Sequence, residues 1–168
     1  MLRIVKNMRD LSFGALMEVY RESNTENGME FWPEEAPWRQ LQLAEERFYE
    51  YLRFDFFSAP GSFYALWEVA GKPVSALRLE PYRDGLLLEA LETALEHRGK
   101  GYAQQLIESI LDTLQSGKVY SHVGKKNDAS LRVHEKCGFR RISEQAVYID
   151  GSANSRCCTF LYEKTREA

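Results

Sequence analysis

Residues 86–114, LLLEALETALEHRGKGYAQQLIESILDTL, are the most informative segment for the fold class. Apolar residues at 103–114 recur at helical spacing opposite a polar face, which predicts an amphipathic helix. Residues 86–95 are ambiguous. Their Ala, Leu and Glu content favours a helix, but their position directly after the turn at 83–85 favours a strand, and we expect a strand. The loop Arg98-Gly99-Lys100-Gly101-Tyr102-Ala103 joins the two.

A glycine-containing loop that opens a helix is suited to binding phosphate. Glycine lets backbone N–H groups approach the oxygens, and a helix N-terminus carries partial positive charge. Arg98 and Lys100 add two cations. The loop matches neither the dinucleotide fingerprint, which would need a small residue where Gln104 stands, nor the GxxxxGK[ST] loop. We therefore predict that main-chain amides at 98–103 hold a diphosphate.

The flanking sequence alternates between the periods of strands and helices. Strands are predicted at 2–8, 63–69, 74–79, 86–95, 118–123, 139–149 and 156–162, and helices at 11–23, 34–56, 103–114 and 127–137. We expect a break at 24–28 and a terminal hairpin around Asp150-Gly151-Ser152. The order β-α-α-β-β-β-α-β-α-β-β predicts an α/β fold, a mixed sheet covered by helices. The length of 168 residues predicts one domain, 1–168.

Composition excludes several classes of function. The net charge is −3 and no basic stripe occurs, so nucleic acid is not expected as a partner. The three cysteines, Cys137, Cys157 and Cys158, form neither a disulfide framework nor a CxxC metal motif, and no metal site is expected. Because the N-terminus lacks a signal-like apolar run and no stretch could span a membrane, we expect a cytoplasmic protein.

Two segments resemble signatures of the GNAT family of N-acetyltransferases. Arg98-x-x-Gly101-x-Ala103 is similar to the family's pyrophosphate motif, and Asn127 to Phe139, NDASLRVHEKCGF, is similar to its second signature. Many members have Tyr where this chain has His134, whereas a branch resembling phosphinothricin acetyltransferases has His. The resemblance covers the chain from Leu2, although only residues 86–139 carry specific motifs.

The resemblance implies that acetyl-CoA is the co-substrate and lies between the strands at 86–95 and 118–123. The pantetheine arm would pair with backbone near Leu91, Thr93 and Leu95. The pyrophosphate would contact the amides of Gly99, Lys100, Gly101, Tyr102 and Ala103, with Arg98 nearby. Asn127 would support the pantetheine, and His134 would line the groove.

Acyl transfer to an amine needs a base, an oxyanion donor and a proton for the leaving thiolate. Glu92 and Glu89 are the candidate bases. A regular strand would put them on opposite faces, but a bulge could reorient one. Glu92 is favoured because it is nearer the expected thioester, while pairing of Glu89 with Arg78 and a proton relay through water stay open. His134 is the candidate proton donor, or it only lines the groove.

The expected function is N-acetylation: an acetyl group moves from acetyl-CoA to a primary amine by direct attack. The acceptor is a small molecule or a protein amino group. It would enter between the first two helices and the final hairpin, where the chain offers Tyr20, Phe31, Trp32, Trp38 and Tyr148. The alternative is a catalytically idle module that senses acyl-CoA. The expected partners are acetyl-CoA and the amine, without nucleic acid or membrane, and a homodimer is left open.

Overall fold

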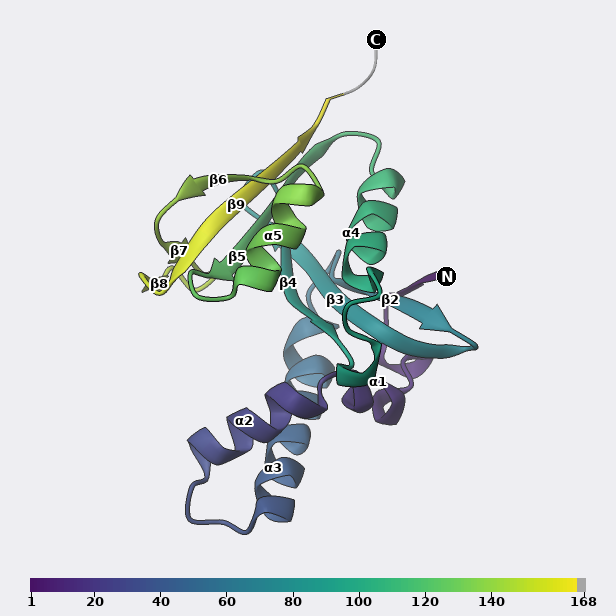
Figure 1. The fold of residues 1–168 in the computed structure, drawn as a ribbon, viewed down its shortest axis with the longest axis vertical. Coiled ribbons are helices and arrows are strands. Elements are labelled where there is room, and N and C mark those ends of the chain that lie inside the picture. The colour runs from purple at the N-terminus through teal and green to yellow at the C-terminus, as the bar shows by residue number, and fades with distance from the viewer. Residues whose placement is uncertain (166–168) are drawn as a thin grey trace.

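A computed structural model describes residues 1–165 and contains a seven-stranded mixed sheet (Figure 1). The strand order is β1-β2-β3-β4-β5-β9-β6, and a separate two-stranded sheet pairs β7 with β8. The strands are β1 (Leu2–Val5), β2 (Phe63–Val69), β3 (Lys72–Tyr82), β4 (Gly85–Thr93), β5 (Gly117–Gly124), β6 (Arg140–Ser143), β7 (Ala146–Val147), β8 (Ala153–Asn154) and β9 (Cys157–Lys164). The mixed α/β fold predicted from the sequence is confirmed.

Helices cover both faces of the sheet (Figure 1). They are α1 (Phe13–Val19), α2 (Arg21–Phe31), α3 (Pro37–Glu50) with a π-helical continuation at Tyr51–Phe56, α4 (Tyr102–Thr113) and α5 (Asp128–Lys136), and 3-10 turns occur at Met8–Asp10 and Leu95–His97. Helices α4 and α5 lie on one face, whereas α2 and α3 extend away from the sheet as a separate lobe, called here the α2–α3 lobe.

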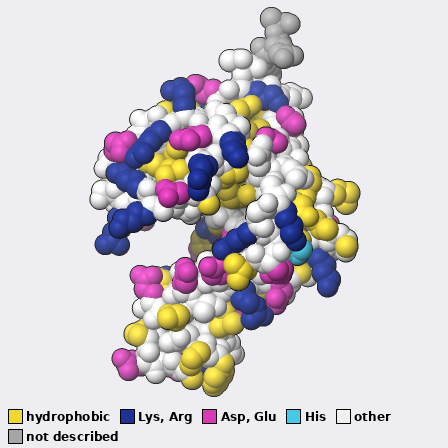
Figure 2. Space-filling model, viewed as in Figure 1, with side chains coloured by type: hydrophobic (Ala, Val, Ile, Leu, Met, Phe, Trp, Pro, Cys, Tyr) yellow, Lys and Arg dark blue, Asp and Glu magenta, His cyan; other side chains and the backbone are white. Residues whose placement is uncertain are grey.

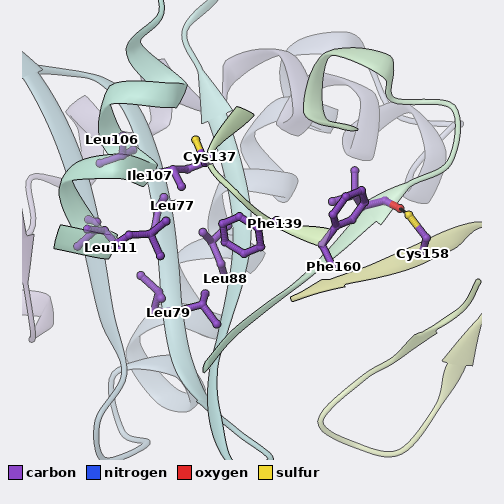
Figure 3. Packing of buried hydrophobic residues seen from close by; sticks show 14 residues of the cluster. Leu77, Leu79, Leu88, Leu106, Ile107, Leu111, Cys137, Phe139, Cys158 and Phe160 are labelled. Atoms are coloured by element: carbon purple, nitrogen blue, oxygen red, sulfur yellow. Dashed lines mark hydrogen bonds between the residues drawn. The ribbon is translucent and has the colours of Figure 1, made fainter. Parts of the chain in front are cut away.

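Two apolar layers hold these helices to the sheet. Figure 3 shows the first, in which Leu106, Ile107 and Leu111 of α4 face Leu77 and Leu79 of β3. The second layer packs α1 and the π-helical turn on the opposite face, with Leu16, Leu52, Phe56, Tyr64 and Leu66 among its buried side chains. Burial of this apolar surface on both sides fixes the sheet between the helices.

Strands β4 and β5 form the parallel pair of the sheet, and they separate early. Their ladder runs only from Leu86 opposite Val119 to Leu88 opposite Ser121. Beyond it β4 bulges: Arg78 pairs with Glu89 but Ala76 pairs with Glu92, so three steps along β4 match two along β3. Ala90 within the bulge has a φ of +52°. The end of β4 therefore has no partner on its β5 side.

The predicted break at 24–28 is wrong, because α2 runs through it. The helix ends at Phe31, and the chain instead turns at Tyr20, between α1 and α2. Gly28 is needed for packing rather than for a turn. A Cβ there would lie 2.6 Å from the carbonyl oxygen of Gln40 on α3. The glycine therefore lets two helices approach closely, a requirement that local sequence does not reveal.

The predicted turn around Asp150-Gly151-Ser152 is present, but it joins strands other than the predicted ones. The segment predicted at 139–149 splits into β6, which pairs with β9, and β7, which pairs with β8. The two-stranded β7–β8 ribbon therefore leaves the main sheet. The predicted helix at 34–56 likewise begins later, with Pro37 at its first turn, and changes to π-helical geometry at Tyr51.

Candidate active site

A cavity of about 620 Å³, called here the loop cavity, opens where β4 ends and α4 begins. Segments from β4, the loop at 97–103, α4 and α5 enclose it, because β4 and β5 no longer pair at this height. It is lined by Leu91, Glu92, Thr93, His97, Arg98, Gly99, Gly101, Tyr102, Ala103, Gln104, Asn127, Ala129, Ser130, Arg132, Val133 and Lys136. Both predicted signatures therefore meet at one cavity.

The loop presents free backbone donors to this cavity. Gly99 and Gly101 have φ values of +73° and +79°, which L side chains rarely adopt. The first backbone bond of α4 runs from the N–H of Gln105 to the carbonyl of Gly101. Within residues 1–165, no amide from 99 to 104 donates to another protein atom. A row of unpaired amides at a helix N-terminus has the chemistry required to hold a diphosphate.

Most of the predicted cofactor residues line the loop cavity, but three do not. Leu91, Thr93, Arg98, Gly99, Gly101, Tyr102, Ala103 and Asn127 are part of its wall. Leu95 is 67% exposed, because β4 ends at Thr93 and a 3-10 turn follows. Lys100 turns back to donate from Nζ to the carbonyl of Glu96 at 3.1 Å. His134 is the third residue outside the wall.

His134 is buried between α5 and the sheet. Its Nε2 lies 2.9 Å from the hydroxyl of Ser121, and its Nδ1 lies 2.7 Å from the carbonyl of Ser130. The ring also packs against Phe139 and Phe160. Burial lowers the pKa of this imidazole, which favours the neutral ring. Both ring nitrogens therefore have protein partners.

Helix α5 contributes two cations that the sequence reasoning missed. Arg132 and Lys136 both line the loop cavity and lie one turn apart on α5. Residues at i and i+4 share a helix face, so this spacing was a signal available in the sequence. Asn127 begins α5, where its side-chain oxygen accepts from the N–H of Ser130 at 3.1 Å.

A second cavity of about 390 Å³, called here the aromatic cavity, lies between the α2–α3 lobe and the sheet. It is lined by Tyr20, Ser23, Asn24, Asn27, Phe31, Trp32, Ala44, Arg47, Phe48, Tyr51, Arg78, Ala90, Leu91 and Glu92. Of the aromatics expected at the acceptor entrance, Tyr20, Phe31 and Trp32 are present, whereas Trp38 and Tyr148 are not. Leu91 and Glu92 line both cavities.

Glu92 lies where the two cavities meet. One carboxylate oxygen accepts from the hydroxyl of Ser23 at 2.6 Å, and the other lies 3.7 Å from Nη2 of Arg98. Arg98 is also paired with Glu22 and donates to the carbonyl of Thr93. Burial raises the pKa of Glu92, while the bond from Ser23 and the charge of Arg98 oppose the rise. Such a carboxylate is a stronger base than an ordinary glutamate.

Glu89 reaches the same side of the sheet as Glu92 because of the bulge, but its carboxylate is already paired. Its Oε2 accepts from Nε of Arg78 at 3.2 Å, the cross-strand pair considered from the sequence. Arg78 in turn stacks over the ring of Tyr51 at 4.7 Å. Glu80 lies beside Glu89, and burial together with the charge of Glu89 raises the pKa of Glu80 to about 7.

Residues 1–165 contain no cluster of three or more metal-ligating side chains. Over the same residues, no helix is long and apolar enough to cross a membrane. The three cysteines are free thiols, and burial raises the pKa of Cys137 to about 11, which makes it unreactive.

Known acetyltransferases are similar to this chain in sequence. Residues 15–139 match the acetyltransferase (GNAT) family. A spermidine N(1)-acetyltransferase from Vibrio cholerae is 28% identical over 142 residues, which cover 79% of this chain and 77% of the relative.

Solved structures share the fold across nearly the whole chain. The N-acetyltransferase PaiA from Thermoplasma acidophilum, in complex with coenzyme A, has a TM-score of 0.66 at 14% identity, over 98% of this chain and 99% of its own. The spermidine N-acetyltransferase from Vibrio cholerae, in complex with CoA and spermine, has a TM-score of 0.58 at 21% identity, over 97% and 94%. The chain belongs to the GNAT acetyltransferase family and is an N-acetyltransferase that transfers an acetyl group from acetyl-CoA to an amine.

Proposed function

We propose that the loop cavity binds acetyl-CoA, that the aromatic cavity binds the acceptor amine, and that the two reactants meet at Leu91 and Glu92. The observation that carries this proposal is that these two residues line both cavities. A thioester that enters from one side and an amine that enters from the other would meet there. Holding both reactants in place removes much of the entropic cost of a bimolecular reaction.

The donor would be held mainly by main-chain groups. The free amides of residues 99–104 would bind the diphosphate. Arg132 and Lys136 would contact phosphate oxygens from the α5 side of the loop cavity. The pantetheine arm would lie along the unpaired edge of β4 beyond Leu88, where β5 has separated. Arg98 would act indirectly, because its guanidinium pairs with Glu22 and Glu92.

The chemistry would be a direct attack. The amine nitrogen bonds to the thioester carbonyl carbon, the carbonyl oxygen takes up negative charge, and the carbon–sulfur bond then breaks to release the CoA thiolate. Glu92, directly or through water, takes the proton that the amine loses. Leu91 has no partner in the β3 ladder, so its N–H is the candidate donor to the oxyanion. The products are the acetylated amine and CoA, whose thiolate takes a proton from solvent.

Glu92 fits the base better than Glu89. Its carboxylate lies at the junction of the cavities, and burial raises its pKa, whereas Glu89 is neutralised by Arg78. We assign His134 to a positioning role: its imidazole joins α5 to Ser121 of β5 and does not reach the loop cavity. Proton donation by His134 stays a prediction that mutagenesis tests.

The acceptor would be a small molecule, because the aromatic cavity is bounded by two helices and the sheet. A volume of about 390 Å³ lies within the range of small-ligand sites. The spermidine N(1)-acetyltransferase relative makes a polyamine the first acceptor to assay. The cytoplasmic location, the single domain and the homodimer stay predictions; free thiols suit a reducing compartment.

The test is an assay of CoA release. Acetyl-CoA is incubated with a panel of primary amines, the free thiol is measured, and mass spectrometry identifies the acetylated product. Glu92→Gln should lower kcat by about a hundredfold or more while the Kd for CoA, measured by calorimetry, stays near that of the wild type. Glu89→Gln is the comparison. A larger loss of kcat in Glu89→Gln than in Glu92→Gln would contradict the assignment of the base.

A further inference from the structure

The aromatic cavity has a chemical character of its own. Five aromatic side chains line it, namely Tyr20, Phe31, Trp32, Phe48 and Tyr51. Several pack against one another, with ring centroids 5.1 Å apart for Tyr20 and Phe48 and 6.1 Å apart for Phe31 and Trp32. Such walls favour an occupant whose middle is an aromatic ring or a comparable apolar body.

Three charged side chains line the aromatic cavity, and they differ in whether they have a partner of opposite charge. Glu92 is its only carboxylate, and it lies at the end shared with the loop cavity. Arg78 is neutralised by Glu89. The guanidinium of Arg47 lies over the ring of Phe31, 4.9 Å from its centroid. Arg47 has no carboxylate within 4.0 Å anywhere in residues 1–165. The cavity therefore presents one cation without a partner.

The two ends of the aromatic cavity are well separated. Glu92 is held by Ser23 near the start of α2, and Arg47 is held by Phe31 at its end. Eight residues separate Ser23 from Phe31, which is about 12 Å along the helix axis. An occupant that contacts both ends must be elongated, with its amine at Glu92 and its other terminus at Arg47.

We propose, on the basis of the proposed function, that the acceptor is an elongated primary amine with an apolar or aromatic middle and an anionic group that binds Arg47. A guanidinium pairs well with a carboxylate or a phosphate, through two parallel hydrogen bonds. Stacking on Phe31 holds the planar group in place for such a pair. A polyamine would instead bring a second ammonium to this cation.

A row of exposed carboxylates on α2 favours the rival occupant. Glu22, Glu26 and Glu30 lie one turn apart and outside the lining of the aromatic cavity. Figure 2 shows acidic side chains along the edge of the α2–α3 lobe that faces the hollow in the molecule. Arg47 is exposed as these carboxylates are, so solvent and salt screen all four charges. Only Arg47 lines the cavity, so we expect it and not the carboxylates to contact the acceptor directly. A polyamine is the alternative outcome of the test.

The experiment compares matched acceptors that differ only in the charge of the far end. The probes are 2-phenylethylamines that carry a 4-carboxylate, a 4-carboxamide or a 4-trimethylammonium group, together with spermidine. A 4-phosphonate probe distinguishes a carboxylate from a phosphate-like group. We expect kcat/KM to be about tenfold higher for an anionic probe than for the carboxamide, and lowest for the trimethylammonium probe.

Variants at Arg47 test whether this cation determines the ranking of the probes by kcat/KM. Arg47→Gln should bring kcat/KM for the anionic probe down to that for the carboxamide probe, and Arg47→Glu should make the anionic probe the poorer of the two. Arg39→Gln is the matched control, because Arg39 lies on the same helix, pairs with Glu46 and is outside the aromatic cavity. It should leave the order unchanged.

The outcomes separate this inference from the function on which it rests. If spermidine or the trimethylammonium probe is the better acceptor in the wild type, the enzyme is an acetyltransferase and the inference is wrong. An unchanged order in both Arg47 variants also overturns it. If no amine releases CoA while CoA still binds, the proposed function fails, and the inference fails with it.

Discussion

The loop cavity and the aromatic cavity meet at the same two residues, yet they are built in different ways. The free main-chain amides of the loop cavity come from one continuous segment, the loop and the start of α4, and α5 adds the cations Arg132 and Lys136. The aromatic cavity uses side chains from α2, α3, β3 and β4, which are distant in sequence. A site made of backbone can persist while sequences diverge, whereas a site made of side chains can change its ligand. Under the proposed function, the substrate that all family members share occupies the site made of backbone.

A substitution behind the aromatic cavity should have the strongest consequences. Gly28→Ala places a Cβ 2.6 Å from the carbonyl oxygen of Gln40, so α2 and α3 must move apart. We expect a loss of about 2 kcal/mol in the free energy of unfolding and a raised KM for the amine, with little change in CoA affinity. Urea unfolding, amine kinetics and calorimetry with CoA check this.

Gly14→Ala provides the control for that substitution. A Cβ at Gly14 of α1 meets nothing within 4 Å, so the same change should stabilise the helix by about 0.5–1 kcal/mol. If both variants change the free energy of unfolding in the same direction, close approach of α2 and α3 does not explain why a glycine occupies position 28.

The next effect concerns the loop cavity. Gly101→Ala forces an L side chain into a φ of +79°, which costs about 1–2 kcal/mol and turns the amides away from the diphosphate. We expect the Kd for CoA to rise about tenfold while amine KM changes little. Gly71→Ala is the control, because Gly71 has a φ of +75° at the β2–β3 turn, away from both cavities. Gly71→Ala should lose a similar amount of stability but bind CoA with the wild-type Kd. If both variants raise the Kd for CoA equally, the loop amides do not bind the diphosphate.

A smaller effect is expected at the junction of the cavities. Ser23 donates to Glu92, and this bond lowers a pKa that burial raises. Removing it in Ser23→Ala should raise the Glu92 pKa further, so the acidic limb of kcat/KM against pH moves to higher pH. The plateau should fall by no more than about tenfold. Thr25→Ala, on the same helix but bonded to the carbonyl of Arg21, should leave the limb in place.

A small change in the pH dependence of Tm should distinguish a structural role of His134 from a catalytic role. Burial lowers the pKa of His134, so the folded protein binds its proton less tightly than the unfolded chain, where histidine titrates near 6.5. Its contribution to stability is complete above that pH and is lost as pH falls through it. His134→Gln should therefore narrow the fall in Tm between pH 7.5 and pH 5.5. A large loss of kcat at unchanged Tm would instead support proton donation.

Local sequence was sufficient for the loop cavity but not for its whole lining. Glycines at 99 and 101 before an amphipathic helix specify a backbone conformation, and that conformation follows from few residues. The prediction extended too far at Leu95, because the strand ends two residues earlier. Lys100 was expected at the diphosphate because it is a cation in the loop, but its long side chain bonds to Glu96.

The aromatic cavity could be predicted only in outline. The aromatics of α2 were visible in the sequence, but Arg47 carried no signal among the charged residues of α3. The break predicted at 24–28 had the composition of a turn, and packing against Gln40 keeps it helical. Tertiary contacts regularly override such local preferences.

The α/β fold class, the order of most elements and the loop that presents free amides follow from the sequence alone, because they depend on periodicity and on glycine conformations within short segments. Which glutamate meets both cavities depends instead on contacts between elements far apart in the chain. The bulge at Ala90 brings Glu89 and Glu92 to one side, and then Arg78 neutralises the first while Ser23 orients the second. A carboxylate's basicity depends on burial and neighbouring charges, and its neighbours here come from elements distant in the chain.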